Sequence, residues 1–200
     1  MALMTIRPTR ADVAIADWIA AHTNPPTEEV AEALTWGADG HVLCVVIAAW
    51  WLHARRQGRP QRRAADHILL TTLVASAMPH LLKAVVDQPR PDRRTVRGHW
   101  RGVPFSGKAL DAFPSGHAVH VGALASAASR LPRPQRNAVW LVGGGLVATR
   151  ILLLAHWSSD VLVGLSIGAV IEQSLRKLTS YGRAQRPARP CKTCRHEHAA

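Results

Sequence analysis

Three clusters of polar residues lie at the ends of apolar segments in this 200-residue chain. The first runs from Lys83 to Arg90, the second is Pro114-Ser115-Gly116-His117, and the third contains Arg150, His156 and Asp160. Together they supply three cations, a candidate helix start and two histidines. These groups can bind an anion and move protons around it.

The three cations favour an anion site. Lys83 and Arg150 lie within or at the end of apolar runs, where an ionisable group is costly and is usually paired or functional. Arg90 lies between two prolines, which predicts a stiff turn after a helix end. The forked guanidinium of arginine suits phosphate oxygens. The alternative for Lys83 is that its long side chain merely reaches toward a membrane surface.

Ser115 and Gly116 stand where an apolar helix is predicted to begin. Backbone N–H groups at a helix start bind phosphate well, and Gly116 would let the anion approach closely. An ordinary helix cap would explain the same motif if it stood alone. His120, one turn later, has no assigned chemistry and is interpreted as structural.

His156 and Asp160 are four residues apart, so they would share a face on a helix. The carboxylate could then accept a hydrogen bond from the imidazole, which would fix the tautomer and leave the other ring nitrogen free to attack. His117 could act as general acid for the leaving group. Each histidine alone is more often structural than catalytic, so the prediction depends on the combination.

The elements that carry these clusters predict an all-α, membrane-embedded helical bundle with about five spans. The apolar segments cover residues 34–52, 68–86, 115–131, 138–155 and 161–175, with a kink expected at Pro79. Gly164 and Gly168 form a small-xxx-small pair, and Gly143, Gly144 and Gly145 offer a second surface for close helix packing. The alternative is a soluble helical protein, since a span needs about 20 apolar residues. The lack of broad polar faces on the second and fourth segments argues against it.

Three regions are expected along the chain. Residues 1–33 would form amphipathic helices on the membrane surface, capped at Thr9 and Thr27. Residues 34–178 would form the membrane core that carries the three clusters, and residues 179–200 a basic, disordered tail. The tail contains Cys191, Cys194, His196 and His198, which are zinc-binding residue types. A structural zinc site wants four ligands at fixed spacing, so a solvated tail is the preferred interpretation and no metal site is predicted.

The net charge of +12 fits either a membrane protein with basic loops or a nucleic-acid binder. With five spans, the basic links at residues 55–63 and 130–136 and the basic tail share one side, which the positive-inside rule makes cytoplasmic. The three polar clusters then lie together on the outer side, where the basic 87–114 loop is expected to meet something anionic. No nucleic-acid partner is predicted, because apolar spans divide the basic residues and no aromatic residues interleave with them.

The three clusters resemble the motifs of the phosphatidic acid phosphatase type 2 superfamily, which also includes the vanadium haloperoxidases and glucose-6-phosphatase. Its signature reads KxxxxxxRP, then PSGH, then SRxxxxxHxxxD. The chain matches the first two throughout and carries Thr149 in place of the serine in the third, which keeps a hydroxyl. The matched stretch, from Lys83 to Asp160, covers about two fifths of the chain.

The resemblance implies a role for each matched residue and no metal or other cofactor. Phosphate would be bound by Lys83, Arg90, Ser115, Gly116 and Arg150, while His156 would be the nucleophile, Asp160 its orienting partner and His117 the general acid. Relatives of this size are multi-pass phosphatases of the bacterial inner membrane, with the site facing the periplasm or exterior. Their substrates include undecaprenyl diphosphate, phosphatidic acid and phosphatidylglycerol phosphate.

Three other functions remain open at the level of sequence. A lipid phosphotransferase would use the same phosphohistidine but pass the phosphate to an alcohol. A vanadate-dependent haloperoxidase is opposed by the short chain and the apolar spans. A non-catalytic membrane lipid-binding protein would be expected to lack a catalytic residue, and none of the core set is missing. The particular lipid and the oligomeric state are not determined by the sequence.

Overall fold

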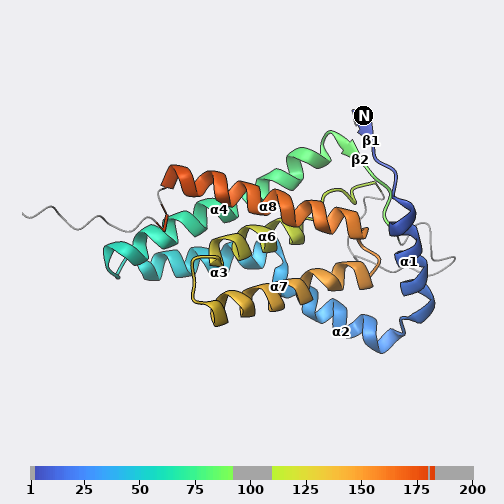
Figure 1. The fold of residues 1–200 in the computed structure, drawn as a ribbon, viewed down its shortest axis with the longest axis horizontal. Helices are drawn as coiled ribbons and strands as arrows, with labels where there is room; N and C mark the ends of the chain where they lie inside the picture. Colours follow the sequence, from blue (N-terminus) through green and yellow to red (C-terminus); the bar gives the residue numbers. More distant parts are fainter. Residues whose placement is uncertain (1–2, 92–109, 180, 183–200) are drawn as a thin grey trace, which may run out of the picture.

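The computed structural model describes residues 3–91, 110–179 and 181–182 of the chain, and these are mainly helical (Figure 1). The predicted all-α class is therefore confirmed. In chain order the elements are β1 Met4–Thr5, α1 Arg10–His22, α2 Pro25–Thr35, the 3-10 helix η1 Trp36–Ala38, α3 Gly40–Ala54, α4 Arg59–Lys83, β2 Val86–Asp87, α6 Gly116–Ala128, α7 Arg133–Leu152 and α8 Ser158–Thr179.

The two N-terminal helices begin at residues that cap their free N–H groups. Thr9 caps α1 as predicted, because its side chain accepts a hydrogen bond from the Asp12 N–H while the Asp12 carboxylate accepts one from the Thr9 N–H. The predicted cap at Thr27 is wrong. Asn24 caps α2 instead, with its Oδ1 3.0 Å from the backbone nitrogen of Thr27.

One helical stretch among the described residues is long and apolar enough to cross a membrane. It runs over Pro25–Ala54, with a mean hydropathy of 1.4 in its most apolar window, and joins α2, η1 and α3. It therefore begins before the predicted limit at residue 34. A core helix of a soluble protein can meet the same criterion, so the count of about five spans stays a prediction.

The core of the bundle forms around α6, which is buried along most of its length and packs most closely against α8. Glycines permit this approach: a Cβ added to Gly168 would lie 2.0 Å from the Val119 carbonyl oxygen, and one added to Gly122 would lie 2.1 Å from the Leu165 oxygen. The packing role predicted for Gly164 and Gly168 is confirmed. The second predicted surface is correct only at Gly143, since a Cβ at Gly144 or Gly145 would meet no atom within 4 Å.

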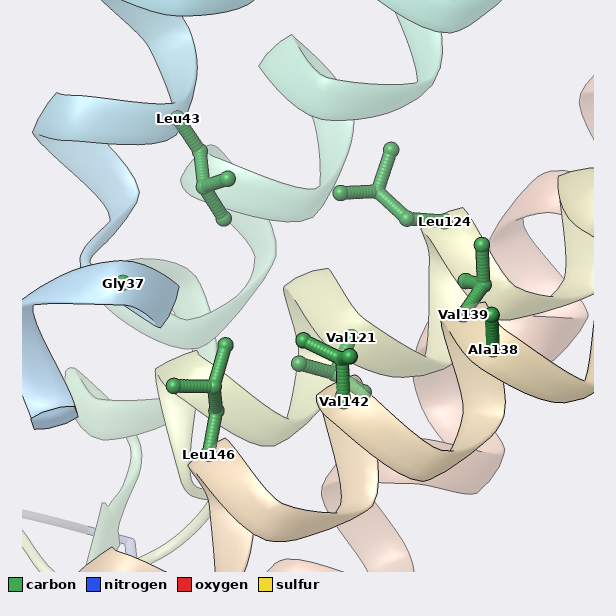
Figure 2. A pocket seen from close by; sticks show the side chains of 9 residues that line it. Gly37, Leu43, Val121, Leu124, Ala138, Val139, Val142 and Leu146 are labelled. Carbon is green, nitrogen blue, oxygen red and sulfur yellow. The ribbon is translucent and has the colours of Figure 1, made fainter. Parts of the chain in front are cut away.

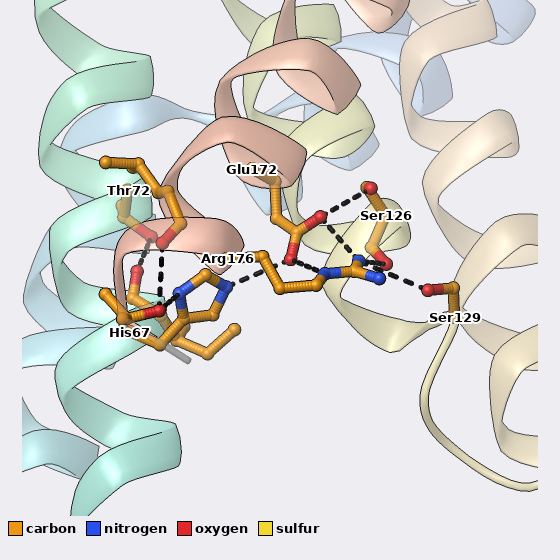
Figure 3. A network of polar contacts seen from close by, with 9 residues as sticks. His67, Thr72, Ser126, Ser129, Glu172 and Arg176 are labelled. Atoms are coloured by element: carbon orange, nitrogen blue, oxygen red, sulfur yellow. Dashed lines mark hydrogen bonds and ion pairs between the residues drawn. The ribbon is translucent and has the colours of Figure 1, made fainter. Parts of the chain in front are cut away.

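A buried polar network joins α4, α6 and α8 near the C-terminal end of α8 (Figure 3). The Glu172 carboxylate lies 3.0 Å from His67 Nε2 and accepts hydrogen bonds from Ser126 Oγ at 2.7 Å and Arg176 Nε at 2.8 Å. Glu172 and His67 are fully buried, so their mutual contacts offset the cost of burying polar groups. The network holds the three helices together roughly 20 Å along α8 from its start, at a rise of 1.5 Å per residue.

Candidate active site

The first cluster is held together by Asp111, a residue that the sequence analysis did not select. Arg90 donates from Nε and Nη2 to Asp111 Oδ1 at 2.8 and 2.7 Å, and Lys83 Nζ lies 3.7 Å from Oδ2. Backbone hydrogen bonds of Gln88 with Leu110 and Ala112, at 2.8 and 3.1 Å, bring the two segments side by side. The only signal in the sequence was an acidic residue shortly before the PSGH motif, which does not by itself name a partner.

The second cluster forms the start of α6, as predicted. Ser115 occupies the N-cap position, Gly116 is the first helical residue, and His117 follows in the first turn. The Ser115 hydroxyl is buried and makes no hydrogen bond with any described residue. It is therefore available to a ligand at the helix start, where the backbone N–H groups also favour an anion.

The third cluster is shaped by the way α7 ends. The Ala155 N–H donates to the Arg150 carbonyl and the Leu154 N–H donates to the Ile151 carbonyl, while Leu154 adopts φ 52°. This pair of bonds around a left-handed residue is the Schellman motif that terminates helices. His156 consequently lies in a turn, and α8 begins only at Ser158.

The expectation that Asp160 contacts the His156 imidazole is not met. His156 Nδ1 lies 2.6 Å from the carbonyl oxygen of Ala112, while Asp160 Oδ2 accepts a hydrogen bond from the Trp157 N–H at 3.0 Å. The two residues do not share a helical face, because His156 lies before the start of α8, which carries Asp160. A carbonyl can only accept, so Nδ1 carries the proton and Nε2 is the free nitrogen.

The surroundings of His156 keep its ring neutral. Burial, followed by the charges of Arg150, Arg90 and Lys83, holds the pKa of His156 well below its usual value. All three predicted cations therefore act electrostatically on this histidine, and Arg90 Nη1 lies 3.5 Å from the carbonyl oxygen of its neighbour Ala155. Arg150 and Lys83 also act electrostatically on His117, so the two histidines share the influence of these two cations.

Arg150 is positioned by a helix that the predicted site did not include. Its Nη1 donates to Thr35 Oγ1 at 3.1 Å, at the C-terminal end of α2. The Nε atom of Arg150 is buried and makes no hydrogen bond with a described residue. The Nη1 end of the guanidinium is thus held by α2, and the Nε–H group remains as a donor for a ligand.

A carboxylate from α1 holds the start of α8. Asp12 accepts hydrogen bonds from Ser158 Oγ at 2.7 Å, from the Ser159 N–H at 2.9 Å and from Ser159 Oγ at 2.8 Å. Burial opposes the charge, but these bonds and those from Thr9 outweigh it and lower the pKa of Asp12 to about 2. The N-terminal helix is therefore anchored beside the turn that carries His156.

Two cavities are lined in part by the short segment that joins α2 to α3. One, of about 410 Å³, is lined by Lys83, Gly116 and His117 and by polar residues of α3 and α4. The other, of about 320 Å³, is almost wholly apolar and lies between α3, α6 and α7, where Leu43, Leu124 and Leu146 point into a common space (Figure 2). The segment between α2 and α3 thus contributes Gly37 to an apolar cavity and Asp39 to a polar one that also contains Lys83.

Comparison with known proteins identifies the family of the chain. Residues 64–183 match the sequence profile of the PAP2 superfamily, so the chain belongs to that family. The resemblance inferred from the three motifs is thereby confirmed. The matched region begins within α4, so α1, α2 and α3 lie outside it.

Two curated relatives are lipid A 1-phosphatases. The protein from Rhizobium etli is 33% identical over 154 residues, which is 70% of this chain and 66% of the relative. The protein from Rhizobium johnstonii is 36% identical over 104 residues, or 52% of this chain and 43% of the relative. The chain therefore spans less than two thirds of either relative's length.

Two solved structures share the fold. The crystal structure of Aquifex aeolicus LpxE has a TM-score of 0.64 and 18% identity, and the match covers 87% of this chain and 99% of that one. A transmembrane PAP2-type phosphatidylglycerolphosphate phosphatase from Bacillus subtilis has a TM-score of 0.62 and 17% identity, with 88% of each chain covered. At these identities the likeness establishes the fold alone.

Proposed function

We propose that the protein is an integral-membrane phosphatase that hydrolyses a lipid phosphate through a phosphohistidine on His156. The observation that carries this proposal is the buried, neutral His156 ring, whose Nδ1 is held by a backbone carbonyl amid the charges of Lys83, Arg90 and Arg150. A neutral imidazole with one free nitrogen is a nucleophile, and the cations would stabilise the charge of the phosphoryl group in transfer.

The reaction would proceed in two displacements. His156 Nε2 attacks phosphorus, the P–N bond forms, and the P–O bond to the lipid breaks while His117 gives its proton to the leaving oxygen. Water then attacks the phosphohistidine, passes a proton to His117 and releases inorganic phosphate. Ser115 and Gly116 would hold phosphate oxygens, and Asp160 would act as a positioning residue by holding the Trp157 N–H beside His156.

The substrate is proposed to be a phosphate ester of a lipid in the bacterial inner membrane, reached from the periplasmic or exterior side. The names of the two curated relatives favour a glycolipid phosphate over phosphatidic acid and undecaprenyl diphosphate. The apolar cavity supports a lipid, because its lining residue Gly37 lies two residues after Thr35, which binds Arg150. A hydrocarbon chain in that cavity would lie close to the phosphate site.

Substitution of the proposed nucleophile tests this function. In detergent, wild-type protein should release phosphate from lipid A or phosphatidic acid with a chelator present, and His156→Ala should release none above background. The control is His53→Ala, an exposed histidine in the last turn of α3, which should keep full activity. Vanadate should inhibit, since it mimics five-coordinate phosphorus.

Three outcomes would contradict parts of the proposal. Full activity in His156→Ala would remove the nucleophile assignment, and loss of wild-type activity on chelation would remove the metal-free mechanism. Transfer of phosphate to an added lipid alcohol, in place of release, would identify a phosphotransferase.

A further inference from the structure

The polar cavity of about 410 Å³ continues from the proposed phosphate site into the space between α3 and α4. The cavity and the proposed phosphate site share Lys83, Gly116 and His117. The remaining polar lining includes Asp39, Ser76 and His120, none of which has a role in the proposed reaction. The volume falls in the range of small-molecule binding sites, so the cavity can hold a polar group of a substrate.

The position of His117 determines which part of a substrate this cavity would hold. In phosphoryl transfer the attacking atom and the leaving oxygen lie roughly in line on opposite sides of phosphorus. If His156 attacks, the leaving oxygen must lie where His117 can protonate it. His117 lines this cavity, so the alcohol attached to that oxygen would extend into it.

Asp39 offers an unused hydrogen-bond acceptor to this alcohol. Its Oδ1 caps α3 by accepting from the N–H groups of His41 and Val42 at 2.9 and 3.2 Å. Among the described residues, its Oδ2 accepts no hydrogen bond, although the side chain keeps 24% exposure. Asp39 and His117 line the same cavity, so the carboxylate lies on the leaving-group side.

From this arrangement we propose that the polar cavity is the subsite for the leaving alcohol, and that Asp39 selects alcohols carrying a free hydroxyl group. An ionised carboxylate accepts hydrogen bonds from hydroxyls and repels other anions. The proposal rests on the phosphatase function proposed above and narrows its substrate class. A sugar-bearing monophosphate is favoured, and a diphosphate is disfavoured because its second phosphate would lie beside Asp39.

Two other lining residues of the cavity, Ser76 and His120, are held in place by a chain of polar contacts. His120 Nδ1 lies 2.9 Å from the Gly116 carbonyl oxygen, and His120 Nε2 lies 2.9 Å from Ser76 Oγ. Ser76 Oγ in turn lies 3.2 Å from Cys44 Sγ of α3. These contacts tie α3 and α4 to the start of α6, so the cavity is preorganised for a ligand of defined shape.

Asp39→Asn separates the charge of the carboxylate from its structural role, because asparagine is an equally good N-cap of similar size. We expect kcat/KM for lipid A 1-phosphate to fall about tenfold or more, as for loss of a hydrogen bond to a charged group. For phosphatidic acid, whose leaving alcohol has no further hydroxyl, kcat/KM should change by less than about twofold, because no hydrogen bond to Asp39 is lost. The variant should hydrolyse undecaprenyl diphosphate faster than the wild-type protein does, because the repulsion between the Asp39 carboxylate and the second phosphate is removed.

The matched control is Asp66→Asn, which removes an exposed carboxylate that binds Trp51 on the α3–α4 pair outside the cavity. This control variant should leave the ratios between the kcat/KM values for the three lipids unchanged. An equal loss on all three lipids in Asp39→Asn, at an unchanged melting temperature, would overturn this inference while leaving the phosphatase intact. Absence of phosphate release from every lipid by wild-type protein would overturn both proposals.

Discussion

At the scale of single residues, Asp111 alters the charge balance of the proposed phosphate site. Two of the three cations, Lys83 and Arg90, share this carboxylate. The arginine is held by two hydrogen bonds to one oxygen, which fixes the plane of its guanidinium. A bound phosphate would therefore meet cations that are already oriented but partly neutralised.

Removing the Asp111 charge should strengthen anion binding. In Asp111→Asn the inhibition constant of inorganic phosphate should fall several-fold, because a negative charge close to the anion has been removed. At the same time kcat should fall, since Arg90 loses a charged partner that positions it. Product-inhibition kinetics on the purified variant measure both effects, and an unchanged inhibition constant would show that Asp111 is only structural.

At the scale of helices, the interruption between α7 and α8 decides where His156 points. Leu154 adopts a left-handed conformation that costs a non-glycine residue on the order of 1–3 kcal/mol. Its side chain is buried in a cluster with Ala16, Ile19 and Trp157, and burial of a leucine offsets a cost of that size. The turn is thus stabilised by packing against α1, which is also bonded to α8 through Asp12.

The contact between α6 and α8 should be the least tolerant of added volume. In Gly168→Ala the new Cβ would lie 2.0 Å from a backbone oxygen, so the helices must separate, and we expect a loss of at least about 1–3 kcal/mol of stability. Gly144→Ala is the matched control on α7. Nothing lies within 4 Å of its new methyl group, so higher helix propensity should stabilise the protein by up to about 1 kcal/mol. Thermal unfolding in one detergent compares the two, and equal melting temperatures would refute the packing argument.

At the scale of the whole molecule, the long axis of the bundle separates the proposed site from the Glu172 network. The 25 residues of α4 rise about 37 Å, which exceeds the roughly 30 Å of a bilayer core. The helix carries Lys83 at one end and adjoins the basic link containing Gln57 at the other (Figure 1). This geometry is compatible with a bundle that presents the two ends to opposite sides of a membrane.

Cysteine labelling tests that orientation. In a chain whose three native cysteines are replaced by serine, Leu110→Cys should react with a membrane-impermeant maleimide added to intact cells. Gln57→Cys should react only after the membrane is broken. Leu110 is exposed beside Asp111, and Gln57 is exposed in the turn before α4. The reverse labelling pattern would place the proposed site in the cytoplasm.

The sequence by itself determined the helical class, the family and the residues around His156. Each depends on local information, namely apolar runs, helix starts and three motifs whose internal spacing is short. The starts of α1 and α6 were predictable for the same reason, since a cap acts within one turn. The N-terminal cap of α2 was misassigned because two polar residues within one helical turn of each other could each serve as the N-cap.

Only the tertiary structure decided which partners hold those residues. The bonds from His156 to Ala112, from Arg150 to Thr35 and from Ser159 to Asp12 join positions 44, 115 and 147 residues apart. No periodicity or local spacing encodes such pairs, because they form when separate helices pack and buried polar groups take the nearest acceptor. The helix break before Ser158 then redirected His156 from Asp160 to a backbone carbonyl. That change leaves Nε2 as the proposed nucleophile and reassigns the group that orients it.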